Sequence, residues 1–204
     1  MTSKRAYNSP LRDMAAARTQ KLILLWAAEL FAARGYGRVT VADVAAAAGV
    51  SSKTVFASVG SKTDILNRIV DHAVEESGYR EAVARILALT TPDAVLAALA
   101  HGTRLGNEGQ STALEAIRKA LPVHEEGEAL WHRASAAYRE ALHAVAAHLG
   151  ALGAVPADLS IEEASDLLWL WFGPNGWHTL VTESGWTWDR AEAALLRTAR
   201  ATFG

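Results

Sequence analysis

The 204-residue sequence contains no cysteine. This absence excludes a disulfide framework, thiolate-ligated metal sites and iron–sulfur clusters. A reducing cytoplasm is the location that we expect, although an exported protein is compatible with the same absence. Only five prolines are present, and alanine, leucine, glutamate and arginine are abundant, a composition that favours helix throughout.

A secretion signal and long apolar runs are missing as well. The N-terminal stretch MTSKRAYNSPLRDM has no apolar core of the kind that signal peptides carry. The most apolar segment, DLLWLWFG at 166–173, is far shorter than the roughly 18 residues that cross a bilayer. We therefore expect a soluble protein with no membrane partner.

Patterns typical of catalysis are also absent. The sequence has no serine–histidine–acid arrangement, phosphate-binding glycine loop or H-E-x-x-H motif. His143 and His148 are five residues apart and do not share a clean helical face, which argues against a metal site between them. We predict no catalytic residue, no cofactor and no bound metal, and a helical enzyme or carrier stays as an alternative.

Charge is divided unevenly along the chain. Residues 1–70 have a net charge of +6, from ten Lys/Arg and four Asp/Glu, whereas residues 71–204 have a net charge of −8. A basic head on an acidic body suggests that the head binds a polyanion. A solvated basic face would give the same count.

Helix signals divide the head into short segments. Apolar residues at helical spacing predict a first helix over about 11–33; they are Leu22, Ile23, Trp26, Leu30 and Phe31. Capping boxes at Thr40-Val-Ala-Asp43 and Ser61-Lys-Thr-Asp64 predict the starts of two later helices. Between them, Ala48-Gly49-Val50-Ser51 is the turn of a helix-turn-helix, in which Gly49 suits the left-handed conformation. We therefore predict a helix-turn-helix DNA-binding domain over 1–66, with 1–10 disordered.

The stretch from Ile23 to Leu66 resembles the TetR family of bacterial transcriptional regulators. It contains FAARGYGRVTV, ADVAAAAGVSSKTVF and SKTDIL, which follow the family pattern G-[YF]-x-x-[TS]-[TV], A-x-A-A-G-V-S, a short recognition helix and S-K-x-x-L. The rest of the chain agrees with the family only in length and helicity. The resemblance implies an all-α protein, with a three-helix DNA-binding domain and a helical-bundle domain for effector binding and dimerisation over 67–204.

Polar side chains and the resemblance together indicate the residues that contact DNA. Thr40 either helps to hold a phosphate or serves only as a helix cap, and Lys62 matches the phosphate-binding lysine of the family. Lys53 is a candidate for guanine or phosphate, and Phe56 is either a core residue or a contact for a thymine methyl group. The predicted set is Thr40, Ser51, Ser52, Lys53, Thr54, Phe56, Ser58 and Lys62.

The recognition helix departs from the family pattern. The family usually has a tyrosine there, followed by an aromatic or His-Phe pair, whereas this chain has Phe56-Ala57-Ser58-Val59. Phe56 has no hydroxyl to donate to a phosphate. Val59 is expected to take the packing role of the usual phenylalanine with less volume.

The body is expected to bind a second copy and an effector. Residues 167–172 are apolar on nearly every side of a helix, so one face is expected to meet a second subunit. By the resemblance, 162–183 and 188–203 form the dimer bundle, and recognition helices about 34–36 Å apart contact a palindromic operator. Gly173-Pro174-Asn175-Gly176 interrupts the apolar helix.

Aromatic residues in the body are candidates for an effector pocket, since five of the seven tryptophans lie between 169 and 188. Such residues are also typical of a core or a dimer interface. The predicted ligand-binding residues are His101, Arg104, Trp131, Ser135, Tyr138, Trp169, Phe172 and Asn175. The sequence thus predicts a repressor that a small hydrophobic or aromatic effector releases from DNA. The alternative regulator is a DNA-binding dimer without a ligand.

Overall fold

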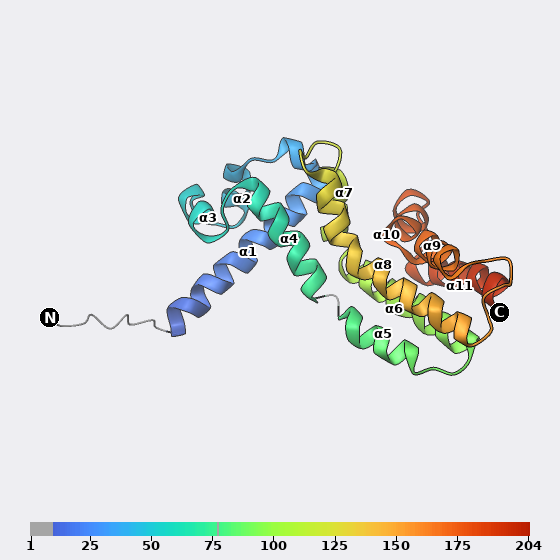
Figure 1. Ribbon diagram of the computed structural model, residues 1–204. Coiled ribbons are helices and arrows are strands. Elements are labelled where there is room, and N and C mark those ends of the chain that lie inside the picture. The colour runs from blue at the N-terminus through green and yellow to red at the C-terminus, as the bar shows by residue number, and fades with distance from the viewer. Residues whose placement is uncertain (1–9, 77) are drawn as a thin grey trace. The chain divides into compact units, whose positions relative to one another are not determined.

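The computed structural model describes residues 10–76 and 78–204, and all regular structure in these ranges is helical (Figure 1). The all-α prediction is confirmed. No helix within these ranges is long and apolar enough to cross a membrane. Of the segment predicted to be disordered, residues 1–9 lie outside the described chain, and Pro10 begins the first helix.

Two compact units make up the described chain. The first contains the described residues through His72 together with Glu115–Leu130, and the second contains Ala73–Leu114 and Trp131–Gly204. The sequence places the boundary at residue 66 and assigns 115–130 to the body. Segment 115–130 packs with the first unit instead, where Lys119 Nζ donates to the Ala32 carbonyl.

The first unit is a helical head. Its elements are α1 (Pro10–Arg34), the 3-10 turn η1 (Tyr36–Arg38), α2 (Val41–Ala47), α3 (Ser52–Ser58), most of α4 (Lys62–Glu76), and most of α7 (Ser111–Ala120). Ile23, Phe31, Val55 and Leu66 are fully buried and form its core. The helix-turn-helix is α2 and α3.

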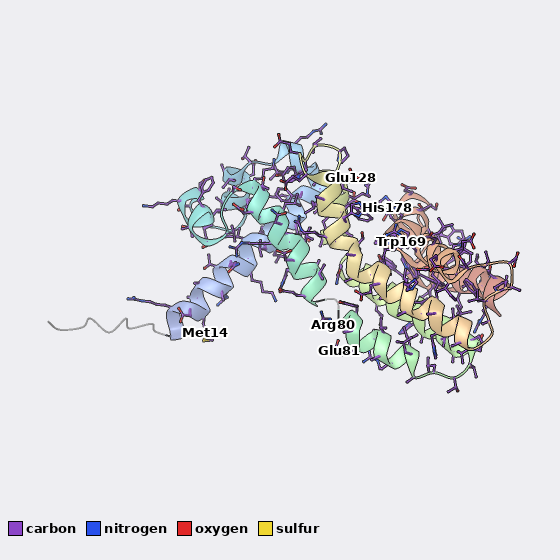
Figure 2. The ribbon with its side chains drawn as sticks, in the orientation of Figure 1. Met14, Arg80, Glu81, Glu128, Trp169 and His178 are labelled. Carbon is purple, nitrogen blue, oxygen red and sulfur yellow. The ribbon has the colours of Figure 1, made fainter. Side chains whose placement is uncertain are left out.

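The apolar stripe predicted for α1 is partly wrong. Ile23, Ala27 and Phe31 are buried, whereas Leu22 and Trp26 are 40% and 41% exposed. The buried residues are four positions apart, which places them along one side of the helix, and each exposed residue precedes a buried one by about 100°. The exposed face continues toward the start of α1, where Met14 lies (Figure 2).

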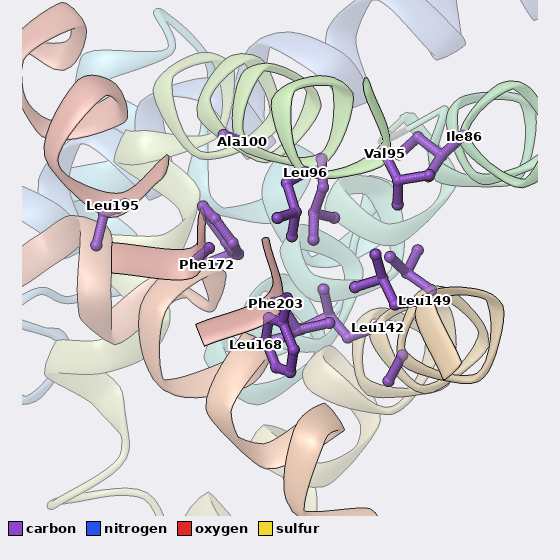
Figure 3. Close-up of a cluster of buried hydrophobic side chains, with 14 of the residues drawn as sticks. Ile86, Val95, Leu96, Ala100, Leu142, Leu149, Leu168, Phe172, Leu195 and Phe203 are labelled. Carbon is purple, nitrogen blue, oxygen red and sulfur yellow. The ribbon is translucent and has the colours of Figure 1, made fainter. Parts of the chain in front are cut away.

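The second unit is a helical bundle. Its elements are α5 (Tyr79–Leu87), α6 (Pro92–Gly109), most of α8 (Gly127–Ala151), α9 (Ile161–Phe172), α10 (Pro174–Trp177), the π-helical turn η2 (His178–Glu183) and α11 (Trp188–Phe203). Figure 3 shows Leu96 of α6, Leu142 of α8, Leu168 and Phe172 of α9, and Phe203 of α11 in one buried cluster. Burial of these side chains stabilises the bundle by about 1.5–3 kcal/mol each.

The apolar segment 162–183 is interrupted at the predicted place. Gly173 ends α9, and Pro174 takes the first position of α10, where its missing N–H costs no helical bond. Within the single chain α9 is not buried on every face, because Leu170 is 63% exposed while Leu168 and Phe172 are fully buried. One face of α9 is therefore uncovered in the described chain.

Candidate nucleic-acid interface and effector region

Thr40 closes a capping box at the start of α2. Its hydroxyl donates to Asp43 Oδ2 at 2.6 Å and accepts from the Asp43 N–H at 3.1 Å, and its own N–H donates to Asp43 Oδ2 at 2.8 Å. The bond from the Thr40 hydroxyl, followed by the bond from its N–H, lowers the pKa of Asp43. The cap is confirmed, and it already uses both donors of Thr40.

The turn between α2 and α3 has the geometry that the sequence predicts. Gly49 adopts φ +68°, and the Val50 N–H donates to the Ala45 carbonyl at 2.9 Å. Ser51 caps α3 by accepting from the Thr54 N–H at 3.1 Å, and the two hydroxyls are 2.8 Å apart. The Ser51 and Thr54 hydroxyls are therefore bonded to each other.

One face of α3 is buried and the other is exposed. Val55 is fully buried and Val59 is 1% exposed, so Val59 has the predicted packing position. Phe56 is 56% exposed and is not a core residue. Lys53 and Ala57 are exposed on the same side of the helix, since positions i, i+3 and i+4 are neighbours.

Lys62 lies at the first position of α4, after a second capping box. The Ser61 hydroxyl and N–H each donate to Asp64 Oδ2 at 2.7 Å and lower the pKa of Asp64, the hydroxyl contributing most. Gly60, at φ +95°, allows this contact because a Cβ there would lie 2.5 Å from Asp64 Oδ2. The Lys62 ammonium lies 4.1 Å from the Tyr36 ring centre, and burial lowers its pKa.

Aromatic side chains from α8 and α9 meet in the second unit. Tyr138 and Trp169 pack edge to face with ring centres 5.6 Å apart, and Trp131 is 6.4 Å from Trp169. Trp169, labelled in Figure 2, also carries the Arg139 guanidinium over its ring at 4.2 Å. Arg139 forms an ion pair with Asp166 at 3.8 Å.

A buried polar network adjoins these rings. Asn107 Nδ2 donates to the Thr103 carbonyl at 2.7 Å and to the Tyr138 hydroxyl at 3.1 Å. The Tyr138 hydroxyl donates to the Phe172 carbonyl, which also accepts from Trp177 Nε1 at 3.1 Å. Burial raises the pKa of Tyr138.

Asn107 has an unmatched acceptor. The residue is 4% exposed, and its Oδ1 has no hydrogen-bond partner among the described residues. Buried polar atoms are nearly always bonded, so an orphaned acceptor marks a place where a donor belongs. The sequence prediction omitted Asn107, although its position four residues after Thr103, on the side of Leu96 and Leu99, was a signal for a buried polar site.

The predicted ligand-binding residues fall into separate places. Trp131, Ser135, Tyr138, Trp169 and Phe172 are brought together, with the Ser135 hydroxyl donating to the Trp131 carbonyl at 2.8 Å. Asn175 is exposed on α10.

His101 and Arg104 lie elsewhere, in an ionic cluster that joins α6 to α11. Arg104 pairs with Asp189, with Glu192 at 3.0 Å and with Glu108 at 3.3 Å. His101 lies 3.3 Å from Glu192. These bonds raise the pKa of Arg104, with the Glu192 hydrogen bond as the main cause.

A capped helix-turn-helix with an exposed, lysine-bearing second helix defines a class of DNA-binding proteins. Residues 23–69 match a family model described as "Bacterial regulatory proteins, tetR family". The TetR resemblance of this segment is thereby confirmed, and the match supports a DNA-binding transcriptional regulator.

Solved structures share the fold along most of the chain. PfmR of Thermus thermophilus, a TetR family transcriptional regulator, has 22% identity and a TM-score of 0.67, over 89% of this chain and 93% of that one. FadR of Bacillus halodurans, a fatty acid degradation regulator, has 14% identity and a TM-score of 0.71, over 89% and 94%.

A third similar structure contains a small molecule. It is a protein from Saccharomonospora viridis, described as a transcriptional regulator and solved in complex with choline, with 22% identity and a TM-score of 0.64, over 88% and 94%. No curated protein matches the chain. The matched family and these structures are described as regulators and not as enzymes, in agreement with the predicted non-enzymatic function.

Proposed function

We propose that this chain is a TetR-like repressor that binds a palindromic operator as a homodimer and is released by a small hydrophobic or aromatic effector. The observation that carries the DNA-binding part is the exposed face of α3, where Lys53 and Phe56 project from a capped helix within residues 1–70, which have a net charge of +6. In this proposal residues 1–66 bind DNA, and the part of 67–204 that lies in the second unit dimerises and binds the effector, in the cytoplasm where the operator lies.

The DNA contacts divide into two kinds. Lys62 contacts a phosphate through its ammonium group. The first backbone N–H groups of α2 and α3 also face phosphates, because helix N-termini attract anions. Thr40, Ser51 and Thr54 act mainly by orienting these N-termini through their caps. Ser52 and Ser58 remain as hydroxyl contacts, and Lys53 and Phe56 face the bases.

Selection of bound duplexes from a random library by the full-length protein tests this function. We expect recovery of an inverted repeat, with tight binding that weakens steeply as salt rises. Lys53→Ala is expected to weaken binding at least tenfold, whereas the control Arg85→Ala removes an exposed positive charge from α5 and leaves binding unchanged. Failure to enrich any duplex overturns the proposal.

Dimerisation is supported by the uncovered face of α9. Leu170 is exposed there, and the half-buried Leu196 lies on α11. A second copy would remove this apolar surface from water. Leu170→Glu is expected to convert the dimer to a monomer in sedimentation velocity, whereas Leu105→Glu, which changes an equally apolar exposed residue on α6, leaves the dimer intact. A monomeric wild-type protein contradicts the proposal.

The effector part is supported by Asn107 beside the aromatic rings. An effector with an N–H or O–H group would satisfy Asn107 Oδ1, while its apolar body contacts Tyr138, Trp131 and Trp169. Helix α4 runs from the head into the second unit, so it can couple effector binding to the head. It begins at Lys62, and its Ala73 carbonyl accepts a hydrogen bond from Gln110 at 3.0 Å within the second unit.

Indole, choline and decanoic acid are suitable effector probes, because they differ in aromaticity, charge and donor groups. We expect at least one to raise the melting temperature of the protein and to release the selected operator. Asn107→Leu is expected to abolish both effects, and Leu105→Ala to retain them. If none of the three shifts melting or operator affinity, the ligand-free dimeric regulator is the better description.

A further inference from the structure

The hydroxyl groups of the recognition helix α3 and its N-cap are bonded to each other or half-buried. Its N-cap Ser51 and its residue Thr54 have their hydroxyls 2.8 Å apart and bonded to each other, and the Thr54 N–H is bonded to Ser51 as well. Ser52 and Ser58 are half-buried. Lys53 is the exposed hydrogen-bonding side chain of this helix.

The same helix exposes an apolar surface. Phe56 is 56% exposed, and Ala57 beside it is exposed too, whereas Val55 and Val59 are buried and anchor the helix in the core. Exposure of the Phe56 ring to water in the isolated head costs free energy. A partner that covers Phe56 would recover that free energy.

The partner is identified by charge and size. Residues 1–70, which include α3, carry a net charge of +6, which favours a polyanion, and a helix of this kind fits the major groove of DNA. The apolar group that bases display in that groove is the 5-methyl of thymine. Lys53 and Phe56 are separated by about 4.5 Å along the helix axis, which is close to the base-pair rise of about 3.4 Å.

We propose that Phe56, with Ala57, recognises the 5-methyl group of thymine in each operator half-site, next to the guanine or phosphate that Lys53 contacts. Hydrogen bonds then position the helix, and an apolar contact supplies base discrimination. This inference rests on the proposed DNA binding, and it specifies what the exposed face of α3 distinguishes.

Replacing thymine by deoxyuridine tests the contact, because it removes the methyl group and leaves the base-pairing edge unchanged. Each thymine of the selected operator is replaced in turn, symmetrically in both half-sites, and the dissociation constant of the full-length protein is measured. Loss of one buried methyl group per half-site is expected to weaken binding about fourfold per half-site. At that position 5-methylcytosine is expected to bind more tightly than cytosine.

Phe56→Ala separates this contact from an effect of DNA shape. The variant is expected to fold, since Phe56 is exposed, and to bind thymine and deoxyuridine operators equally. The control Trp26→Ala removes another exposed aromatic residue of the head, from α1, and should retain the thymine preference. Circular dichroism and thermal melting establish the fold of both variants.

The outcomes separate the two levels of the proposal. If no duplex is selected, DNA binding itself fails. If an operator is selected but every deoxyuridine substitution leaves its affinity unchanged, methyl recognition is overturned while DNA binding stands. A thymine preference that persists in Phe56→Ala also overturns the assignment to Phe56.

Discussion

The Lys62 ammonium lies 4.1 Å from the centre of the Tyr36 ring, so the start of α4 is held against the turn that follows α1. A positive charge at a helix N-terminus is opposed by the helix dipole. The cation–π contact, worth about 0.5–1 kcal/mol where the pair is exposed, offsets this cost. Tyr36 is itself fixed by Phe31, with ring centres 5.1 Å apart. Lys62 is therefore positioned by the core of the head.

Lys62→Met is expected to weaken operator binding across all sequences, because a phosphate contact carries no base information. The slope of log affinity against log salt concentration should become shallower by about 0.9 for each subunit. Thermal stability should stay about the same, since the loss of the cation–π contact offsets the relief of the dipole. Arg85→Met, which removes an exposed charge from α5, serves as the control. An unchanged salt slope in Lys62→Met would exclude the phosphate contact.

Ser61→Ala removes the N-cap of α4 and is expected to lower the free energy of unfolding by about 1 kcal/mol. Thr63→Ala changes the hydroxyl residue two positions later, which is exposed and outside the cap, and should alter stability by less than about 0.5 kcal/mol. Urea denaturation of the two variants measures the difference. Equal losses in both variants would argue against the cap.

Acid is expected to destabilise the protein through its capping carboxylates. Bonds to Thr40 and Ser61 hold the pKa values of Asp43 and Asp64 below the ordinary 3.8. A carboxylate whose pKa is lower in the folded state stabilises that state fully above its unfolded pKa, and the contribution is lost as pH falls through the folded pKa. Melting temperature should therefore fall below about pH 4.

Asp64→Asn tests this pH dependence. The variant is expected to be less stable than wild type at pH 7 and to lose less stability on acidification. Asp71→Asn, which replaces an exposed carboxylate on the same helix, is the control and should keep the wild-type profile. Parallel wild-type and Asp64→Asn profiles below pH 4 would remove the capping explanation.

Tyr138→Phe is expected to lower the free energy of unfolding by about 1 kcal/mol, because the hydroxyl both donates to Phe172 and accepts from Asn107. Asn107→Leu should cost less, since it also removes the unmatched Oδ1 acceptor. Denaturant melts without effector compare the two variants. A larger loss in Asn107→Leu would show that Oδ1 is satisfied in the folded protein.

Local features of the head could be predicted from the sequence. Capping boxes such as Thr40 with Asp43 are bonds between residues three positions apart, so their partners are near each other in any chain that starts a helix there. The left-handed turn at Gly49 is local as well, and so is the break before Pro174 in the second unit. Each depends on backbone sterics and hydrogen bonds within a few residues.

The tertiary structure decided which side of each helix is buried and which residues distant in the sequence bond to each other. Phe56 and Trp26 are as apolar as their buried neighbours, so hydrophobicity did not show that they face outward. Arg104 pairs with Glu192 across the bundle, and Asn107 is buried against Tyr138. The sequence by itself determined where the capped helices of the head begin, because caps act over three residues. Only packing decided which acceptor is left unmatched and which aromatic ring is exposed, because these depend on residues that are distant along the chain.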